Sequence, residues 1–410
     1  MTTYDRSPWI DSFPESRVPA FPKLRGALQT DVAIVGGGLT GSVTAYAFAA
    51  AGIKVVVVDA GQLGRGSSGS SSGWIADDPG IGFREVATTL GLKAARHGWQ
   101  SWRRAALDFI ALVRRLNLKC RFEPRGALLV AATAEQFARL KQEQKIRREA
   151  GLDAPMVNAR TVSAEAGAGA LAAIRTHDGA TFDPYRATIG LADAAIDRGA
   201  QFFERSPVKK ITFSRKWVEV QTPGGAIRAD RVVVATGVPT ALFKTLARHF
   251  WYRSRFLTLT DRVPAKVRQQ LGLGGVVVRD SALPPHIIRW ANDSQLLVTG
   301  ADTDAVEPRL REKAIVQRTG QLMYEMSTIY PDVSGILPEY GWEAVYGRTA
   351  DGLPFIGPHR NYPRHLFALG DASYGVTGAY LASRILLRHF LDQADASDEV
   401  FGFLRLPRSG

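Results

Sequence analysis

The chain has 410 residues, of which 45% are hydrophobic and 22% are charged, and its formal net charge is +13. This length suits two domains, and no apolar run approaches the ~18 residues of a membrane span. The single cysteine, Cys120, and seven scattered histidines exclude a disulfide within the chain and a cysteine-held iron–sulfur cluster, and predict no metal site. The N-terminus has no apolar signal region, so we expect a cytoplasmic protein.

The first motif is a glycine-rich turn between a short β-branched strand and an alanine-rich helix. Its spacing is G-x-G-x-x-G, at Gly36, Gly38 and Gly41. The first glycine allows a tight turn, the second leaves room for a pyrophosphate, and the third lets the helix pack closely on the sheet. The N–H groups of Leu39 and Thr40 begin the helix, where they can bind phosphates. This context predicts a dinucleotide site.

A second β-branched strand ends at Asp59, followed by Ala60. A carboxylate at this place can bind a ribose hydroxyl and would repel the 2′-phosphate of NADP. The segment 64–73, GRGSSGSSSG, comes next. It is either a flexible linker or a run of small residues that lets backbone and hydroxyl groups approach a long dinucleotide, and the second interpretation favours FAD over NAD. Its candidate contacts are Arg65, Ser67, Ser68 and Ser71.

The rest of the chain is predicted to contain further parallel βαβ units, which two insertions interrupt. Helices are expected over about 40–51, 91–118, 134–149, 186–198, 309–328 and 378–390. Strands are expected over 32–35, 53–58, 127–131, 208–213, 217–221, 231–235 and 365–369, with antiparallel strands over 255–260, 275–279, 286–290 and 295–299. The fold class is therefore α/β. We assign residues 31–85, 155–243 and 338–400 to a discontinuous Rossmann-like FAD-binding domain, and residues 86–154 and 244–337 to an α+β substrate domain with an antiparallel sheet.

Basic residues are concentrated between Lys93 and Arg121, where Asp108 is the only acid. Such a stretch is most often a solvated helix face, and the alternative is a docking face for an acidic partner. No nucleic-acid recognition motif is present. The final strand leads into Gly370-Asp371 and then into a turn from Tyr374 to Gly378. This turn places a second helix N-terminus beside a cofactor.

These motifs resemble the D-amino-acid oxidase superfamily of flavoproteins, in the branch of glycine oxidase, sarcosine oxidase and gamma-glutamylputrescine oxidase. The resemblance covers nearly the whole chain. Its carriers are TDVAIVGGGLTG, VVVVDA, GSSGSSSGWI, FDPYRATIGLADAAIDRGAQFFE, ADRVVVATG, WEAVYGRTADGLPFIG and LFALGDASYGVTGAYLASRIL. Ser70-Ser71 departs from the family, which usually has Arg-Asn there.

The resemblance implies non-covalent FAD, because relatives that attach the flavin covalently use a cysteine at a place that falls near Ala344. It places Val208 at the adenine, and Thr236 and Gly237 on the adenosine side. It places the C-terminal turn at the flavin, with the candidates Gly370, Gly375, Val376, Thr377 and Gly378.

The expected reaction is hydride transfer to flavin N5 from the carbon beside an amine nitrogen, in an amine or an amino acid. The alternatives are another flavoenzyme, such as a hydroxy-acid dehydrogenase or a hydroxylase, and a flavin subunit of a larger amine dehydrogenase. Arg289 and Arg348 are candidates for binding an anionic substrate group, with Tyr346 as a wall of the site. Against this stands the simpler interpretation that both arginines are surface or salt-bridged residues.

Overall fold

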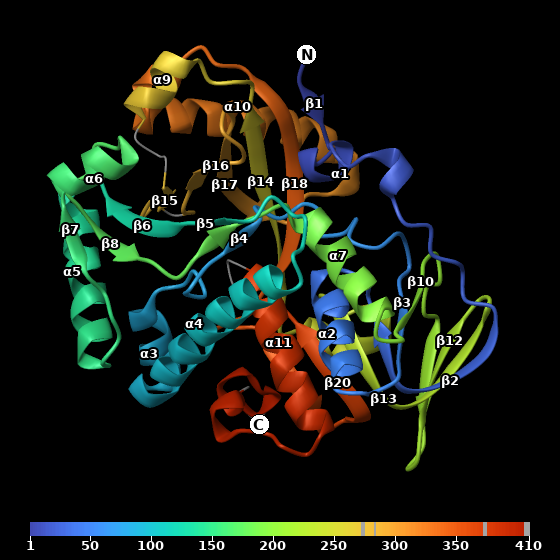
Figure 1. The fold of residues 1–410 in the computed structure, drawn as a ribbon. Helices are drawn as coiled ribbons and strands as arrows, with labels where there is room; N and C mark the ends of the chain where they lie inside the picture. The colour runs from blue at the N-terminus through green and yellow to red at the C-terminus, as the bar shows by residue number, and fades with distance from the viewer. Residues whose placement is uncertain (272–274, 283, 372–374, 406–410) are drawn as a thin grey trace.

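The computed structural model describes residues 1–271, 275–282, 284–371 and 375–405. It contains two large mixed sheets and a small three-stranded sheet (Figure 1). The three strands of the small sheet are β4 (Trp74–Ile75), β9 (Ala180–Thr181) and β5 (Glu123–Pro124). The predicted combination of α/β and antiparallel material is confirmed.

The first large sheet is built around five parallel strands. Its members are β2 (Gly26–Val35), β3 (Val55–Val58), β10 (Gln201–Phe203), β11 (Lys210–Phe213), β12 (Val218–Thr222), β13 (Gly225–Gly237), β19 (Phe355–His359) and β20 (Tyr362–Leu369). β2 lies between β3 and β13, all three run parallel, and β20 pairs parallel with β13. The residues of β3 are entirely buried, as expected for a parallel sheet that is covered on both faces.

The second large sheet has nine strands in the order β1-β18-β14-β17-β16-β15-β6-β8-β7. In chain order they are β1 (Thr3–Tyr4), β6 (Gly126–Ala131), β7 (Met156–Asn158), β8 (Ala172–Thr176), β14 (Trp251–Thr260), β15 (Val276–Arg279), β16 (Ile287–Trp290), β17 (Leu296–Asp304) and β18 (Pro338–Arg348). The antiparallel pairing expected among β14 to β17 is confirmed.

Two segments that the sequence assigns to the FAD-binding domain pair with strands of the nine-stranded sheet. β7 and β8 extend from β6, and β18 pairs with β14 over ten positions from Trp251↔Arg348 to Thr260↔Pro338. Chain order alone does not reveal such pairings. We therefore propose that the domain boundaries fall after β8 and after β18.

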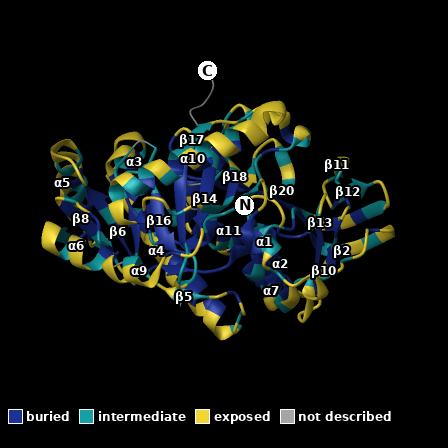
Figure 2. Ribbon diagram, turned by 90° about the horizontal axis from the view of Figure 1, so that it is seen from above, coloured by how far each residue is buried: buried dark blue, intermediate teal, exposed yellow. Residues whose placement is uncertain are grey.

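The helices pack on the faces of the sheets. They are α1 (Pro8–Asp11), α2 (Leu39–Ala50), α3 (Phe83–Leu90), α4 (Leu92–Arg115), α5 (Ala134–Glu149), α6 (Ala159–Ala166), α7 (Pro184–Ile196), α8 (Lys244–Ala247), α9 (Ala265–Gln270), α10 (Arg311–Ile329) and α11 (Gly375–Phe390). Short 3₁₀ turns lie at Glu15–Arg17, Ala241–Phe243, Pro308–Leu310, Pro331–Val333, Ala396–Phe401 and Phe403–Arg405. Figure 2 shows the buried strands between helices whose outer sides are exposed. Among the described helices, none is both long and apolar enough to cross a bilayer.

The predicted long amphipathic helix corresponds to α4. Its apolar side includes the buried Trp99 and Trp102, while its arginines face solvent. Two of these arginines form surface ion pairs, Arg103 with Asp178 and Arg104 with Asp108. An acidic partner for this face stays a prediction.

The strands of the nine-stranded sheet separate two apolar cores. Phe256 of β14 packs into the core beneath α10, which also contains Ile288 and Leu322. The neighbouring Leu257 packs on the opposite side, in the core shared with α2, α4 and α11. Alternate side chains along one strand thus point to opposite faces, and the face that carries Leu257 borders the candidate site.

Candidate functional site

The glycine-rich turn follows β2 directly and leads into α2. Gly36 has φ +109°, and a Cβ on it would lie 2.5 Å from the carbonyl oxygen of Ala235. A Cβ on Gly41 would lie 1.8 Å from the carbonyl oxygen of Gly36. These two glycines are therefore required by backbone packing. A Cβ on Gly38 would lie 2.8 Å from the Ser68 hydroxyl oxygen, so the absence of a side chain here lets Ser68 approach the turn.

The carboxylate of Asp59 stabilises the backbone of the glycine-rich turn. One carboxylate oxygen accepts a hydrogen bond from the Gly37 N–H at 2.7 Å, and the other accepts from the Gly61 N–H at 2.7 Å. The Ser68 hydroxyl accepts from the Leu39 N–H at 2.8 Å, at the beginning of α2. Carboxylate and serine thus fix the backbone that the sequence predicts as a phosphate cradle.

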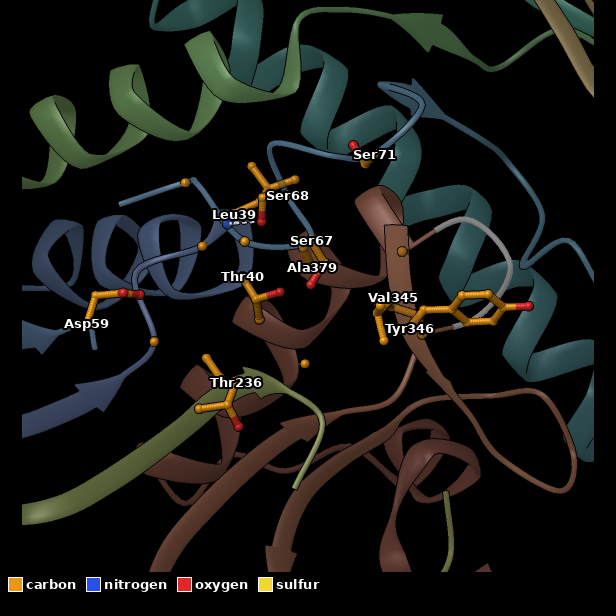
Figure 3. Close-up of a pocket in the computed structure, with 18 of the residues that line it drawn as sticks. Leu39, Thr40, Asp59, Ser67, Ser68, Ser71, Thr236, Val345, Tyr346 and Ala379 are labelled. Atoms are coloured by element: carbon orange, nitrogen blue, oxygen red, sulfur yellow. Dashed lines mark hydrogen bonds between the residues drawn. The ribbon is translucent and has the colours of Figure 1, made fainter. Parts of the chain in front are cut away.

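A cavity of about 370 Å³ begins at this turn and ends at the nine-stranded sheet. Figure 3 shows Asp59 at one end, Thr40, Ser67 and Ser68 along it, and Val345 and Tyr346 on the β18 side. The predicted cofactor residues that line it are Gly36, Gly38, Leu39, Thr40, Asp59, Ala60, Ser67, Ser68, Ser71, Val208, Thr236, Gly237, Gly375 and Val376. The predicted residues absent from its lining are Gly41, Arg65, Gly370, Thr377 and Gly378.

The absent residues support the site from behind or face solvent. A Cβ on Gly378 would lie 2.9 Å from the ring of Trp102, so this glycine lets α11 pack against α4. The Thr377 hydroxyl is buried and donates to the Ala76 carbonyl at 2.7 Å. Arg65 is exposed. Sequence spacing does not distinguish a glycine that faces a ligand from one that faces a neighbouring helix. Residues 372–374, which include Tyr374 of the predicted turn, lie outside the described residues.

Three polar side chains from neighbouring strands meet at the sheet end of the cavity. Arg255 of β14 binds Asp302 of β17, with Nε 2.9 Å from Oδ1 and Nη2 2.7 Å from Oδ2. The hydroxyl of Tyr346 on β18 donates to Asp302 Oδ2 at 2.7 Å. Burial raises the pKa of Tyr346 to about 12, which keeps this donor protonated.

Arg255 is the one cationic side chain in the described lining of the cavity. The sequence analysis missed it because its partner comes from another strand, 47 positions along the chain. The sequence does contain a signal for Arg255: it lies two residues before Leu257 in a predicted strand, so both side chains are expected on the same face. Asp371 also lines the cavity, and burial raises its pKa to about 6 although Arg255 opposes the shift.

Neither arginine predicted to bind the substrate lines the cavity. The Arg289 side chain is buried behind the serine-rich segment, where Nε donates to the Ser72 carbonyl at 2.9 Å and Nη1 to the Trp290 carbonyl at 2.9 Å. Arg348 is half exposed and lies 3.8 Å from Glu85. Of the three predicted substrate contacts, the structure therefore brings Tyr346 alone to the cavity, and the carboxylate clamp is not assembled.

A family model described as FAD dependent oxidoreductase matches residues 31–388. The chain belongs to this family. The oxidoreductase is 26% identical to the gamma-glutamylputrescine oxidoreductase of Escherichia coli over 396 residues, which cover 94% of this chain and 89% of the relative. It is 25% identical to the probable oxidoreductase OrdL of Haemophilus influenzae over 401 residues, which cover 94% of this chain and 88% of that protein.

Among solved structures, glycine oxidase from Geobacillus kaustophilus matches the oxidoreductase with a TM-score of 0.76 at 19% identity. The match covers 93% of this chain and 100% of that one. It confirms the fold, and the family membership confirms FAD as the cofactor of the oxidoreductase.

The lining of the cavity fits FAD. Its glycine-turn end offers backbone N–H groups, serine hydroxyls and the Asp59 carboxylate, which suit phosphates and a ribose. Its opposite end adds apolar side chains, Leu257, Val376 and Ala379, which suit a flat ring. Gly38 lines the cavity together with Ser68, whose hydroxyl lies close to the place where a Cβ on Gly38 would be.

We expect the flavin of the oxidoreductase to be bound without a covalent bond. Ala344, at the place where some relatives carry the attachment cysteine, lines the cavity and cannot form a thioether. Cys120 is fully buried in another segment, and burial raises the pKa of its thiol to about 12. Acid precipitation should therefore release all the yellow colour into the supernatant. A flavin-bearing peptide in the pellet would contradict this expectation.

Proposed function

We propose that the oxidoreductase removes a hydride from the carbon beside an amine nitrogen, converting the C–N bond to an imine that water hydrolyses. One observation carries this proposal: a single cavity extends from the glycine-rich turn to the nine-stranded sheet, where both polar and apolar side chains line it. A cofactor and a small substrate can thus meet inside it. The names of the relatives add support, because one acts on gamma-glutamylputrescine and another is a glycine oxidase.

FAD supplies the hydride acceptor when it is bound. The backbone of residues 36–40 and the Ser68 hydroxyl would bind its pyrophosphate, and Asp59 its ribose. Val208 and Thr236 would border its adenosine half, and Gly375 and Val376 its ring. The side chains of Leu257 and Ala344 would exclude water from the reacting carbon, which protects the transfer of the hydride.

The sheet end of the cavity favours an amine without a carboxylate on the reacting carbon. The charge of Arg255 is shared with Asp302 through hydrogen bonds from Nε and Nη2, and the Asp371 carboxylate adds negative charge nearby. A carboxylate entering this end would compete with Asp302 for one guanidinium. An ammonium group would instead meet the Asp371 carboxylate, whose pKa of about 6 suits it to take up a proton.

Anaerobic flavin bleaching by matched substrates tests the proposal. Putrescine and ornithine share a diamine skeleton and differ by one carboxylate, so we expect amines such as putrescine and its N-acylated forms to bleach the flavin faster than ornithine. Equal or faster bleaching by the amino acid would overturn the preference for amines. Bleaching by a 2-hydroxy acid, with none by any amine, would replace the proposed reaction by that of a hydroxy-acid dehydrogenase.

A further inference from the structure

Three consecutive carbonyl groups of the serine-rich segment accept hydrogen bonds from side chains of three distant elements. Trp342 of β18 donates to the Ser70 carbonyl through Nε1 at 3.0 Å. Trp9 of α1 donates to the Ser71 carbonyl at 2.9 Å, and Arg289 of β16 donates to the Ser72 carbonyl at 2.9 Å. The backbone of residues 70–72 is therefore fixed from outside the cavity, while Ser71 and Ser72 line the cavity itself. Such bonds replace the hydration of carbonyl groups that a loop would otherwise expose.

Arg289 brings a positive charge directly behind this segment. Its side chain is 1% exposed, and its guanidinium carbon lies 5.4 Å from the centre of the Trp9 ring. A Cβ on Gly73 would lie 3.1 Å from Nη2 of Arg289 and 2.2 Å from the Phe182 carbonyl oxygen. The glycine thus allows the chain to pass over the guanidinium at close range.

The printed hydrogen bonds of Arg289 in the described part of the chain go to carbonyl groups, and the carboxylates of Glu123 and Asp183 act on its charge without such a bond. Burial lowers the pKa of its guanidinium to about 9 and the nearby Arg125 acts in the same direction, while Glu123 and Asp183 oppose the shift, so Arg289 stays protonated at neutral pH. Because these carboxylates do not offset the burial, a further negative charge close to the guanidinium would stabilise it. The cavity is the place from which such a charge can come.

We propose that Arg289 is a positioning residue for FAD: with Trp9 and Trp342 it fixes the cavity wall at residues 70–72, and its buried charge stabilises the negative charge that the flavin gains on reduction. The segment itself has uncharged side chains at Ser70 and Ser71. Here the guanidinium stands behind the segment instead. The inference rests on the proposed placement of FAD and not on the identity of the substrate.

Two measurements on purified holoenzyme test the inference, the midpoint potential of the flavin and the Kd of FAD. Arg289→Met removes the charge and the donors, whereas Arg289→Lys keeps the charge and loses the planar fork. We expect a more negative midpoint potential in Arg289→Met and a potential near that of the wild type in Arg289→Lys. Trp9→Phe and Trp342→Phe should raise the Kd of FAD several-fold without moving the potential. Arg348→Met, which removes an exposed arginine, should change neither quantity.

An unshifted potential in Arg289→Met, or an equal shift in Arg289→Lys, would overturn the role of the charge. Unchanged FAD affinity in both tryptophan variants would overturn the role of the carbonyl contacts. If Arg289→Met does not accumulate as folded protein, Arg289→Gln keeps an N–H donor for the Ser72 carbonyl without the charge, and the same shift is expected. No measurement needs an amine, so failure here is distinguishable from failure of the proposed reaction.

Discussion

Gly41→Ala should yield no stable FAD-bound protein. The added Cβ would lie 1.8 Å from the carbonyl oxygen of Gly36, and this neighbour is a backbone atom that cannot rotate away. Relief requires α2 to move off β2, which breaks both the buried packing and the phosphate cradle. We expect a cost of at least about 3 kcal/mol in the free energy of unfolding, the upper range for overpacked cores. Soluble yield, thermal unfolding and flavin content measure the effect.

Gly320→Ala provides the matched control. Gly320 also lies in a helix, α10, where a Cβ would meet nothing within 4 Å. Alanine is the better helix former by roughly 1 kcal/mol, so this variant should bind FAD normally and unfold at the same or a higher temperature. A Gly41→Ala protein with normal flavin content and an unchanged Tm would show that the tight approach of α2 to β2 is not required.

Asp59→Ala should lower the affinity for FAD by about 10- to 150-fold, since a hydrogen bond to a charged group contributes about 1.5–3 kcal/mol. The variant loses the carboxylate that we propose binds the ribose, and it leaves the Gly37 and Gly61 N–H groups without this acceptor. Titration of apoprotein with FAD gives the Kd directly. Asp59→Asn, which keeps one carbonyl oxygen, should lie between the wild type and the alanine variant.

Asp31→Ala separates cofactor binding from support of the strands. Asp31 lies on β2 and accepts a hydrogen bond from the Lys54 N–H at 2.8 Å, but it does not line the cavity. Its loss should lower stability without changing the Kd of FAD. Equal Kd values for the wild type and Asp59→Ala would mean that Asp59 does not contribute to FAD binding.

The cofactor half of the site could be predicted from the sequence because it is local. A strand, a glycine turn and a helix within 30 residues dictate where Gly36, Gly38 and Leu39 lie, whatever the rest of the chain does. The antiparallel strands were predicted for the same reason, from alternation and turn residues. The fold class and the place of Asp59 at the rim of the cavity follow from these local rules.

The substrate half could not be predicted in this way because it depends on which strands become neighbours. Arg255, Asp302 and Tyr346 meet only after β14, β17 and β18 have paired. The same pairing turns Arg289 toward the serine-rich segment, although its sequence context of apolar residues and a tryptophan also suits a substrate pocket. The local sequence pattern predicts which side chains share one face of a strand, but it does not predict which other elements that face contacts.

The pairing of the N-terminal strand β1 with β18 has a consequence for biosynthesis. β1 pairs with β18 at Thr3↔Tyr340, and Trp342, one of the donors to the serine-rich segment, follows two residues later. At roughly 5–20 residues per second, the ribosome needs on the order of tens of seconds to deliver β18 after the glycine turn has emerged. During that interval the nascent chain carries a nucleotide cradle that lacks its far wall. FAD should therefore be captured only by nearly complete chains, and ribosome-bound fragments that end before residue 338 should bind no flavin.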